Sequence, residues 1–408
     1  MKIAIIWEQT LSGGVDTHLL NLLRNWPKGD KFIIFYNRGN KGFSRIKEDI
    51  DILKNITHVP YSSIFFNNTE NPNSRFINTL TRYFRYLFFP LLFPLALIQL
   101  KRLLSKIGGF DAIIANNGGY PAAWSCLASM LSSRNLKITK RILLIHHAAV
   151  EPYFFYAKLE RYIDKKIQES ATDIVAVSLA TRKSLIDNRS FDVKRLPIQI
   201  IYNGIDTDQL NLSSDFPLRG YLGVDKDTLL FGVLGRIEKY KGHDDLIKAF
   251  SMLSDQDKAK AIIVFIGSGL DNEITRLKTI SKLNNVGKYV IFTGYLKANA
   301  FDLIAQLDLL LSMTKDFEGF GLTIAEAMLV KTPVLATRVG GVTEFLDNSV
   351  GTLVDPEAPG QVAKKLKEFI KNPEPFKEKT NKASKIITEK FTAKKMTEQF
   401  YKLVHNAQ

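Results

Sequence analysis

The sequence predicts an α/β protein of two domains in series, each a parallel sheet with helices on both faces. Its 408 residues are more than one ordinary domain holds. Hydrophobic residues make up 45% and charged residues 24%, as in globular proteins with a sizeable core. Strand-like and helix-like patterns alternate along the chain, which indicates parallel sheets joined by helical crossovers.

The first domain opens with an apolar strand, a loop that contains Gly13 and Gly14, and a helical pattern from Val15. Two glycines after a strand are a weak sign of a phosphate-binding loop, because an ordinary turn explains them equally well. The stretches expected to form its strands are residues 2–7, 31–36, 110–115, 141–145, 173–177 and 198–202. His146 and His147 follow one of these strands, at the end where open α/β sheets bind ligands, so one of the two is a candidate site residue.

The net charge of +15 lies mainly in the first half, where residues 1–200 carry 28 basic and 15 acidic side chains. Such a surface favours an anionic partner. The apolar run at residues 87–100 is shorter than the roughly 20 residues of a transmembrane helix. It suits an interfacial segment on anionic lipid, a helix buried against the sheet, or both on opposite faces. Four cations flank the run: Arg82, Arg85, Lys101 and Arg102.

The composition changes near Asp206, where a polar stretch precedes a new alternation of strands and helices. We expect the domain boundary there. The strands expected in the second domain are residues 229–234, 261–266, 289–293, 307–312 and 333–336. Arg236 and Lys241 follow the first of them, where a guanidinium and an ammonium suit a diphosphate. The alternative is a pair of solvated surface cations.

The most informative stretch is residues 316–328, in which a loop with an acid and two glycines runs into a helix. Gly319 and Gly321 allow a tight turn, and the helix start offers N–H groups and partial positive charge to a phosphate. Glu318 and Glu326 would be about 12 Å apart if the chain between them were helical, similar to a nucleoside diphosphate sugar from ribose to sugar. The alternative is an ordinary amphipathic helix with Glu326 exposed.

Together these motifs resemble the family 4 (group 1) retaining glycosyltransferases of GT-B fold, over nearly the whole chain. The matching motifs are Gly13-Gly14, Asn203-Gly204-Ile205-Asp206, Gly235-Arg236 with Lys241-Gly242, Glu318 through Glu326, and Gly340-Gly341. The resemblance implies two Rossmann-like, doubly wound parallel-sheet domains that face a central cleft. Residues 1–205 with a C-terminal helix at about 390–408 would bind the acceptor, and residues 206–389 the nucleotide sugar.

The resemblance also implies roles for single residues. Arg236 and Lys241 would hold the donor's pyrophosphate, Glu318 the donor sugar and Glu326 the ribose. His146, with His147 as the alternative, would lie near the reacting sugar. The implied catalytic residues are His146, Glu318, Arg236 and Lys241. The remaining donor-binding positions are Gly13, Gly14, Gly267, Gly319, Phe320, Gly321 and Leu322, of which residues 320–322 would offer backbone N–H groups.

No metal or other cofactor is expected, because the family needs none. The chain has Asp-x-Asp triplets beginning at Asp49, Asp206 and Asp225, but none lies at a clean strand end beside the expected phosphate-binding cations. Cys126 is the only cysteine, so an internal disulfide and a Cys-based zinc site are excluded.

The expected function is transfer of a hexose, with retention, from a nucleoside diphosphate sugar to a hydroxyl of a lipid-linked or cell-envelope polysaccharide acceptor. The expected location is cytoplasmic, peripheral at the inner face of the cell membrane, with an anionic membrane surface as a further partner. A sugar-nucleotide epimerase of the same fold and a non-catalytic basic nucleic-acid-binding protein are the alternatives. No nucleic-acid partner is expected, because the basic residues do not occur together with a known nucleic-acid-binding motif.

Overall fold

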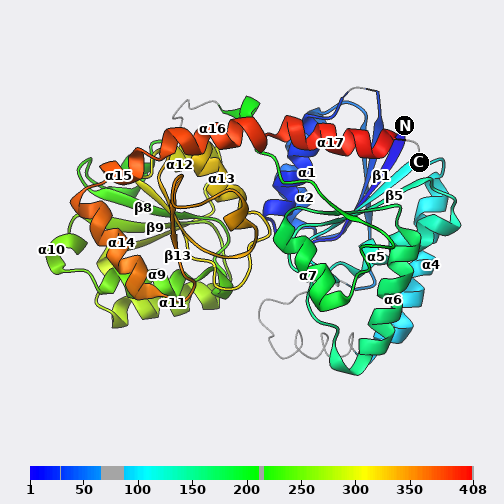
Figure 1. Ribbon diagram of the computed structural model, residues 1–408, viewed down its shortest axis with the longest axis horizontal. Helices are drawn as coiled ribbons and strands as arrows, with labels where there is room; N and C mark the ends of the chain where they lie inside the picture. The colour runs from blue at the N-terminus through cyan, green and yellow to red at the C-terminus, as the bar shows by residue number, and fades with distance from the viewer. Residues whose placement is uncertain (28, 66–86, 211–215, 407–408) are drawn as a thin grey trace. The chain divides into compact units, whose positions relative to one another are not determined.

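The computed structural model describes residues 1–27, 29–65, 87–210 and 216–406. The chain divides into two compact units, one of Met1–Tyr202 with Met396–Gln408 and the other of Asn203–Lys395. Each unit is a Rossmann-like parallel sheet with helices against it (Figure 1), which confirms the predicted fold class.

The first unit holds a parallel sheet in the order β3-β2-β1-β4-β5-β6-β7. Its strands are β1 (Lys2–Trp7), β2 (Lys31–Asn37), β3 (Ile56–Tyr61), β4 (Ala112–Asn117), β5 (Lys140–Ile145), β6 (Asp173–Ala176) and β7 (Ile198–Ile200). Its helices include α1 (Gly14–Arg24), α2 (Lys41–Ile52), α4 (Phe89–Ile107), α5 (Trp124–Asn135), α6 (Ala157–Ser170) and α7 (Leu179–Arg189). The apolar faces of α4, α5 and α6 share one core with the inward residues of the strands.

The second unit holds a parallel sheet in the order β10-β9-β8-β11-β12-β13. Its strands are β8 (Leu229–Leu234), β9 (Ala261–Ile266), β10 (Val290–Gly294), β11 (Leu309–Ser312), β12 (Val334–Thr337) and β13 (Thr352–Val354). Its helices are α8 (Leu218–Leu222), α9 (His243–Ser251), α10 (Asp255–Lys258), α11 (Asp271–Leu283), α12 (Ala300–Ala305), α13 (Leu322–Leu329), α14 (Pro359–Lys371), α15 (Glu374–Lys377) and α16 (Thr380–Lys390).

Each sheet has a topological switch point, which is the position where the strand order reverses. The connections on its two sides run toward opposite edges of the sheet. In the first unit β1 lies between β2 and β4, and in the second unit β8 lies between β9 and β11. Ligands of doubly wound sheets bind beyond the carboxyl ends of the strands at this point. The loops that follow β1 and β4, and those that follow β8 and β11, are therefore the places to look for a site.

The last helix, α17 (Ala393–His405), begins in the second unit and continues in the first from Met396. Its Phe400 ring lies 5.8 Å from the ring of His18 on α1, and its Tyr401 ring lies 5.6 Å from that of Trp26. Nε2 of His405 lies 3.2 Å from Oδ2 of Asp30. The helix is thus fixed to α1 and to the residues that follow it.

Candidate functional site

The clearest site lies at the switch point of the second unit. The loop after β8 carries Lys241 and the loop after β11 carries Glu318, and the two side chains form an ion pair with 2.5 Å between Nζ and Oε2. Two residues that are 77 positions apart in the sequence meet here because β8 and β11 are neighbours in the sheet. The topology thus brings together two of the predicted site residues.

Glu318 is also held from the carboxyl ends of β11 and β12. The hydroxyl of Thr314 donates to Oε2 of Glu318 at 3.2 Å, and the hydroxyl of Thr337 donates to the carbonyl of Thr314 at 2.6 Å. The backbone N–H of Gly341 donates to the carbonyl of Glu318 at 2.8 Å. Gly340 has φ +50, and a Cβ there would lie 2.2 Å from that same carbonyl oxygen. The Gly340-Gly341 pair therefore positions the Glu318 main chain.

A second glycine fixes the other half of the ion pair. Gly242 follows Lys241 with φ +68, and a Cβ at Gly242 would lie only 1.9 Å from the carbonyl oxygen of Met313. A residue with a Cβ could not keep this conformation at this distance. The close approach sets the spacing between the loop after β8 and the loop after β11.

The ion pair is only partly exposed, with 22% of the Lys241 side chain and 18% of the Glu318 side chain accessible. Burial disfavours the charged form of Lys241, but interactions with the Glu318 carboxylate and with the phenol group of Tyr240 outweigh it, and the pKa of Lys241 is raised. Nζ of Lys241 lies 5.1 Å from the centre of the Tyr240 ring. Lys241 is thus a cation at every physiological pH, as a phosphate ligand must be.

Arg236 lies in the same loop as Lys241 and is the more exposed of the two cations. Its Nη1 lies 3.1 Å from Oε1 of Glu238. The loop rests on His243, whose Nε2 lies 3.4 Å from the Arg236 carbonyl oxygen. Burial is the largest cause that lowers the pKa of His243, to about 4, so this imidazole is neutral. The sequence did not point to His243, because a buried side chain under a loop leaves no pattern.

The predicted glycine loop leads into α13. Gly321 has φ +97 and precedes the first helical residue, Leu322, so the backbone N–H groups at the start of α13 are free of a side-chain cap. The ring of Phe320 is buried and stacks on Phe345 at 4.7 Å, so only its backbone is available to a ligand. Glu326 lies in α13 and is partly exposed. This exposure is compatible both with a ribose-binding role and with an ordinary surface position.

Gly267 at the end of β9 has a packing role. Its φ is +147, and a Cβ there would lie 1.9 Å from the carbonyl oxygen of Gly235. The N–H of Gly235 donates to the carbonyl of Ile266 at 2.9 Å. Gly267 therefore lets the loop that carries Arg236 lie against the end of β9. Its predicted contact with the donor stays a prediction.

In the first unit, a buried polar cluster lies at the ends of β4 and β5. Nε2 of His146 pairs with Oδ1 of Asn116 at 2.7 Å, and Asn117 is also buried. Burial, and then the nearby His18, holds the pKa of His146 well below its usual value. The rings of His18 and His146 are 4.5 Å apart. Within the part of the chain that the structure describes, Nδ1 of His146 and Nδ2 of both asparagines have no hydrogen-bond partner.

Asn116 and Asn117 were missed as site residues, although polar side chains at the end of a buried strand are a usable signal. His147, the alternative to His146, is partly exposed.

Gly13 and Gly14 lie where β1 leads into α1, but an acid is already present there. The N–H of Gly13 donates to Oδ1 of Asp16 at 2.6 Å, and Nε of Arg45 lies 2.5 Å from Oδ2 of Asp16. Asp16 is fully buried. The role of the two glycines in donor binding stays a prediction.

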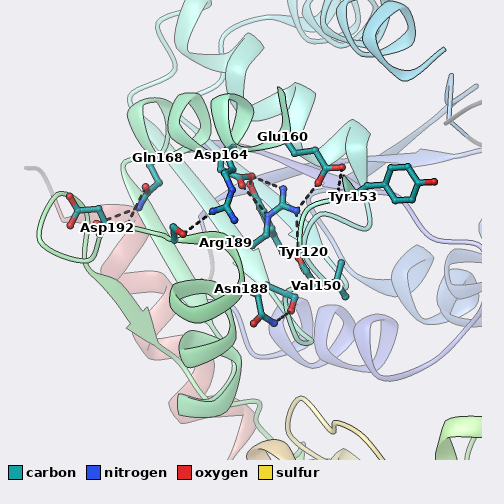
Figure 2. Close-up of polar contacts among 12 residues, drawn as sticks. Tyr120, Val150, Tyr153, Glu160, Asp164, Gln168, Asn188, Arg189 and Asp192 are labelled. Carbon is teal, nitrogen blue, oxygen red and sulfur yellow. Dashed lines mark hydrogen bonds and ion pairs between the residues drawn. The ribbon is translucent and has the colours of Figure 1, made fainter. Parts of the chain in front are cut away.

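The loop after β5 is anchored by a buried arginine. Arg189 at the end of α7 is fully buried, with Nη1 at 2.7 Å from Oε2 of Glu160 and Nε at 3.0 Å from Oδ2 of Asp164. Figure 2 shows these three side chains together with Tyr120, whose hydroxyl donates to Asp164 at 2.6 Å. The side chain of the neighbouring Asn188 donates to the carbonyl of Ala149 at 2.7 Å. The cluster ties α6 and α7 to the segment that follows the two candidate histidines.

Among the predicted surface cations, Lys101 and Arg102 are exposed on α4, and Arg82 and Arg85 lie outside the described residues. No helix in the described part of the chain is long and apolar enough to cross a membrane. No three His, Cys, Asp or Glu side chains among the described residues gather as metal ligands, and metal independence stays a prediction. Of the first Asp-x-Asp triplet, Asp49 pairs with Arg24 and Asp51 with Lys47.

Two Rossmann-like parallel-sheet units in series are the architecture of the GT-B class. The profile of the Glycosyltransferase Family 4 matches residues 12–209, and that of Glycosyl transferases group 1 matches residues 217–388. The chain belongs to this family of glycosyltransferases, as the resemblance predicted.

Three proteins illustrate what this chain is similar to over half of its length or more. An uncharacterized glycosyltransferase of Methanocaldococcus jannaschii is 26% identical over 61% of this chain and 62% of its own length. The N-acetyl-alpha-D-glucosaminyl L-malate synthase of Bacillus anthracis is 27% identical over 55% of this chain and 58% of its own length. The chain thus spans about three fifths of these curated relatives. The crystal structure of Anabaena HepE in complex with UDP and glucose superposes with a TM-score of 0.77 over 98% of both chains, at 19% identity.

Proposed function

We propose that this protein is a glycosyltransferase that moves a hexose from a nucleoside diphosphate sugar to a hydroxyl group of an acceptor. The observation that carries the proposal is the Lys241–Glu318 pair at the switch point of the second unit, with Arg236 in the same loop and the start of α13 next to Glu318. Cations and the N–H groups at a helix start suit the phosphates of a sugar diphosphate, and a carboxylate suits the hydroxyl groups of its sugar. The UDP and glucose bound by the structurally similar HepE fit this donor class.

Each residue then has a chemical task. Arg236 and Lys241 hold the pyrophosphate, Glu318 accepts hydrogen bonds from the sugar hydroxyls, and Glu326 accepts them from the ribose. As the bond between the anomeric carbon and the phosphate oxygen breaks, its electron pair stays on the phosphate. The two cations and the start of α13 stabilise that charge. No metal is proposed, because these groups already offer positive charge to the phosphates.

The acceptor end is proposed for the first unit. His146, Asn116 and Asn117 are neutral, buried and incompletely hydrogen bonded, which suits hydroxyl groups rather than phosphates. The acceptor oxygen attacks the anomeric carbon on the face from which the phosphate departs, so the configuration is retained. The acceptor proton passes to the departing phosphate, which balances the step.

The basic first half suits an acceptor attached to an anionic lipid or polymer of the cell envelope, at the inner face of the membrane. We therefore place the protein in the cytoplasm as a peripheral membrane enzyme.

A ligand screen followed by product analysis tests this function. Thermal unfolding with UDP, GDP and ADP sugars should reveal one base that raises the melting temperature, since a ligand that binds only the folded state stabilises it. The selected donor is then incubated with acceptor mixtures, and the products are separated by mass. A new glycoside supports transfer, and an isomerised nucleotide sugar would indicate an epimerase instead. Binding of nucleic acid with no donor binding would contradict the proposal.

A further inference from the structure

Helix α4 is apolar on both of its faces. Its inner face packs Phe89, Phe93, Ala96, Leu100 and Leu104 into the core. Its outer face is exposed and just as apolar over the first turns, although helices at the surface of a globular protein normally carry polar residues there. The exposed apolar residues are Leu87, just before the helix, and Pro90, Leu91, Pro94, Leu95 and Ile98 on it, and we call these six the apolar strip. A contiguous exposed apolar surface of this kind indicates a site that binds a partner.

Two exposed phenylalanines lie next to the beginning of the strip. The short helix η1 (Phe154–Tyr156) exposes 86% of Phe154 and 76% of Phe155. The hydroxyl of Tyr156 donates to the carbonyl of Leu87 at 3.0 Å, so η1 is joined to the first residue of the strip. The N–H of Tyr153 donates to Glu160 of the buried arginine cluster at 3.3 Å (Figure 2). These two hydrogen bonds hold the backbone of η1 in place, and the Phe154 and Phe155 rings extend from it into solvent.

The charges around the strip are almost all positive. Helix α4 contains no acidic residue, and the outer face that carries the strip continues into Lys101, Arg102 and Lys106. Among the described residues, α6 follows η1 with the exposed basic side chains of Lys158, Arg161 and Lys165, and the exposed acid Glu151 precedes η1. An apolar surface bordered by cations complements a bilayer with anionic headgroups better than it complements an acidic protein, which has no acyl chains to receive the leucines.

We propose that the apolar strip, with Phe154 and Phe155, docks this protein on an anionic lipid bilayer. Helix α4 lies in the plane of the interface, with its leucines at the level of the upper acyl chains. The cations of α4 and α6 contact the lipid phosphates. This docking specifies the surface through which the proposed envelope glycosyltransferase meets its membrane, but it depends on neither the donor nor the reaction.

Co-sedimentation with vesicles of phosphatidylglycerol and phosphatidylcholine tests the docking. The full chain is compared with the variants Leu91→Asp/Leu95→Asp and Phe154→Ser/Phe155→Ser, and with Leu283→Asp as a matched control. Leu283 is an exposed leucine of α11 in the other unit, 77% accessible, so its replacement adds one negative charge away from the strip, half of what Leu91→Asp/Leu95→Asp adds. We expect the native chain and the control to bind anionic vesicles, and each double variant to bind at least tenfold more weakly. High salt and pure phosphatidylcholine should also weaken binding.

Several outcomes would overturn the docking. One is a native chain that does not bind anionic vesicles, and another is binding of the two double variants equal to that of the control. A native dimer in light scattering that Leu91→Asp/Leu95→Asp converts to a monomer, without vesicle binding, would assign the strip to a second copy of the chain. Donor-induced thermal stabilisation, measured on the same samples, separates these results from failure of the proposed transferase function, because it does not involve α4.

Discussion

Both units carry polar side chains at the carboxyl ends of central strands, but those of the second unit are charged and those of the first unit are neutral. The second unit presents a charged pair, Lys241 and Glu318, whose partly buried ions neutralise each other. The first unit presents a neutral imidazole, His146, beside two buried asparagines. We infer that doubly wound topology sets where a ligand can bind in each unit, whereas the side chains there set which chemical groups of a ligand they suit. Phosphates suit the second unit and hydroxyl groups suit the first.

The units also differ in how their loops are held. In the second unit, glycines in close contact with carbonyl groups set the distance between neighbouring loops. In the first unit, the loop after the candidate histidine is held by side chains, through Asn188 and the buried Arg189. The predictions below test this contrast, beginning with the largest expected effect.

Replacing Gly242 by Ala should damage the second unit severely, because a Cβ would overlap the Met313 carbonyl. We expect a loss of about 3 kcal/mol in the free energy of unfolding of this unit, from the clash together with the positive φ. Chemical denaturation followed by circular dichroism measures it. Gly223→Ala is the matched control, since Gly223 has φ +63 and no atom within 4 Å of the added Cβ. Equal losses in both variants would show that the contact with Met313 is unimportant.

Replacing Arg236 by Ala should lower turnover by about a hundredfold, because one preorganised cation at the departing phosphate is lost. The loss in donor affinity should be smaller. Lys365→Ala is the control, since Lys365 forms a surface ion pair of similar exposure with Glu368 on α14. Steady-state kinetics with the selected donor gives both parameters. Turnover that is unchanged in Arg236→Ala would remove this residue from the site.

Replacing Glu326 by Ala should weaken binding of the nucleoside diphosphate by about tenfold, the usual effect of losing one charged hydrogen bond. Titration calorimetry with the free diphosphate measures the effect without the sugar. The exposed Glu374 at the start of α15 provides the control variant Glu374→Ala. If the two variants bind equally well, Glu326 belongs to the surface of an ordinary amphipathic helix.

The buried His243 should make stability depend on pH below neutrality. Its pKa is about 4 in the folded state, against 6.5 for a solvent-exposed histidine, so the unfolded chain takes up a proton first as the pH falls. Stability is therefore complete above pH 6.5 and declines below it, by about 1.3 kcal/mol between pH 7.5 and 5.5. Denaturation of the native chain and of His243→Gln at both pH values measures the difference. A decline of equal size in both chains would exclude His243 as its cause.

The sequence was sufficient for the interior of each sheet and for one edge strand of each, β7 and β10, but not for the strand at the other edge. Buried central strands such as β1 and β8 are continuous apolar runs, which the pattern identifies. The missed strands β3 and β13 both lie at sheet edges. β3 contains His58 and Pro60, and β13 has only three residues, because an edge strand pairs on one side and tolerates polar residues and proline.

The candidate site divides in a similar way. Motifs with glycines and charges predicted Arg236, Lys241 and Glu318 as site residues, and the structure brings the last two into contact. The direct ion pair between Lys241 and Glu318 was not foreseen, because it depends on which strands are neighbours. Asn116 and His243 were also missed as site residues, since their importance comes from burial next to a loop and not from spacing. The sequence did not predict a surface role for Phe154 and Phe155, because their exposure follows only from the fold.

The account is tested most directly by a crystal structure of the protein with the nucleoside diphosphate sugar that stabilises it. We expect the diphosphate within hydrogen-bond distance of Arg236, Lys241 and the backbone at the start of α13, with the ribose at Glu326 and the sugar at Glu318. Density for the diphosphate at another place, such as the loop of Gly13 and Gly14 in the first unit, would contradict the division of chemistry between the two units.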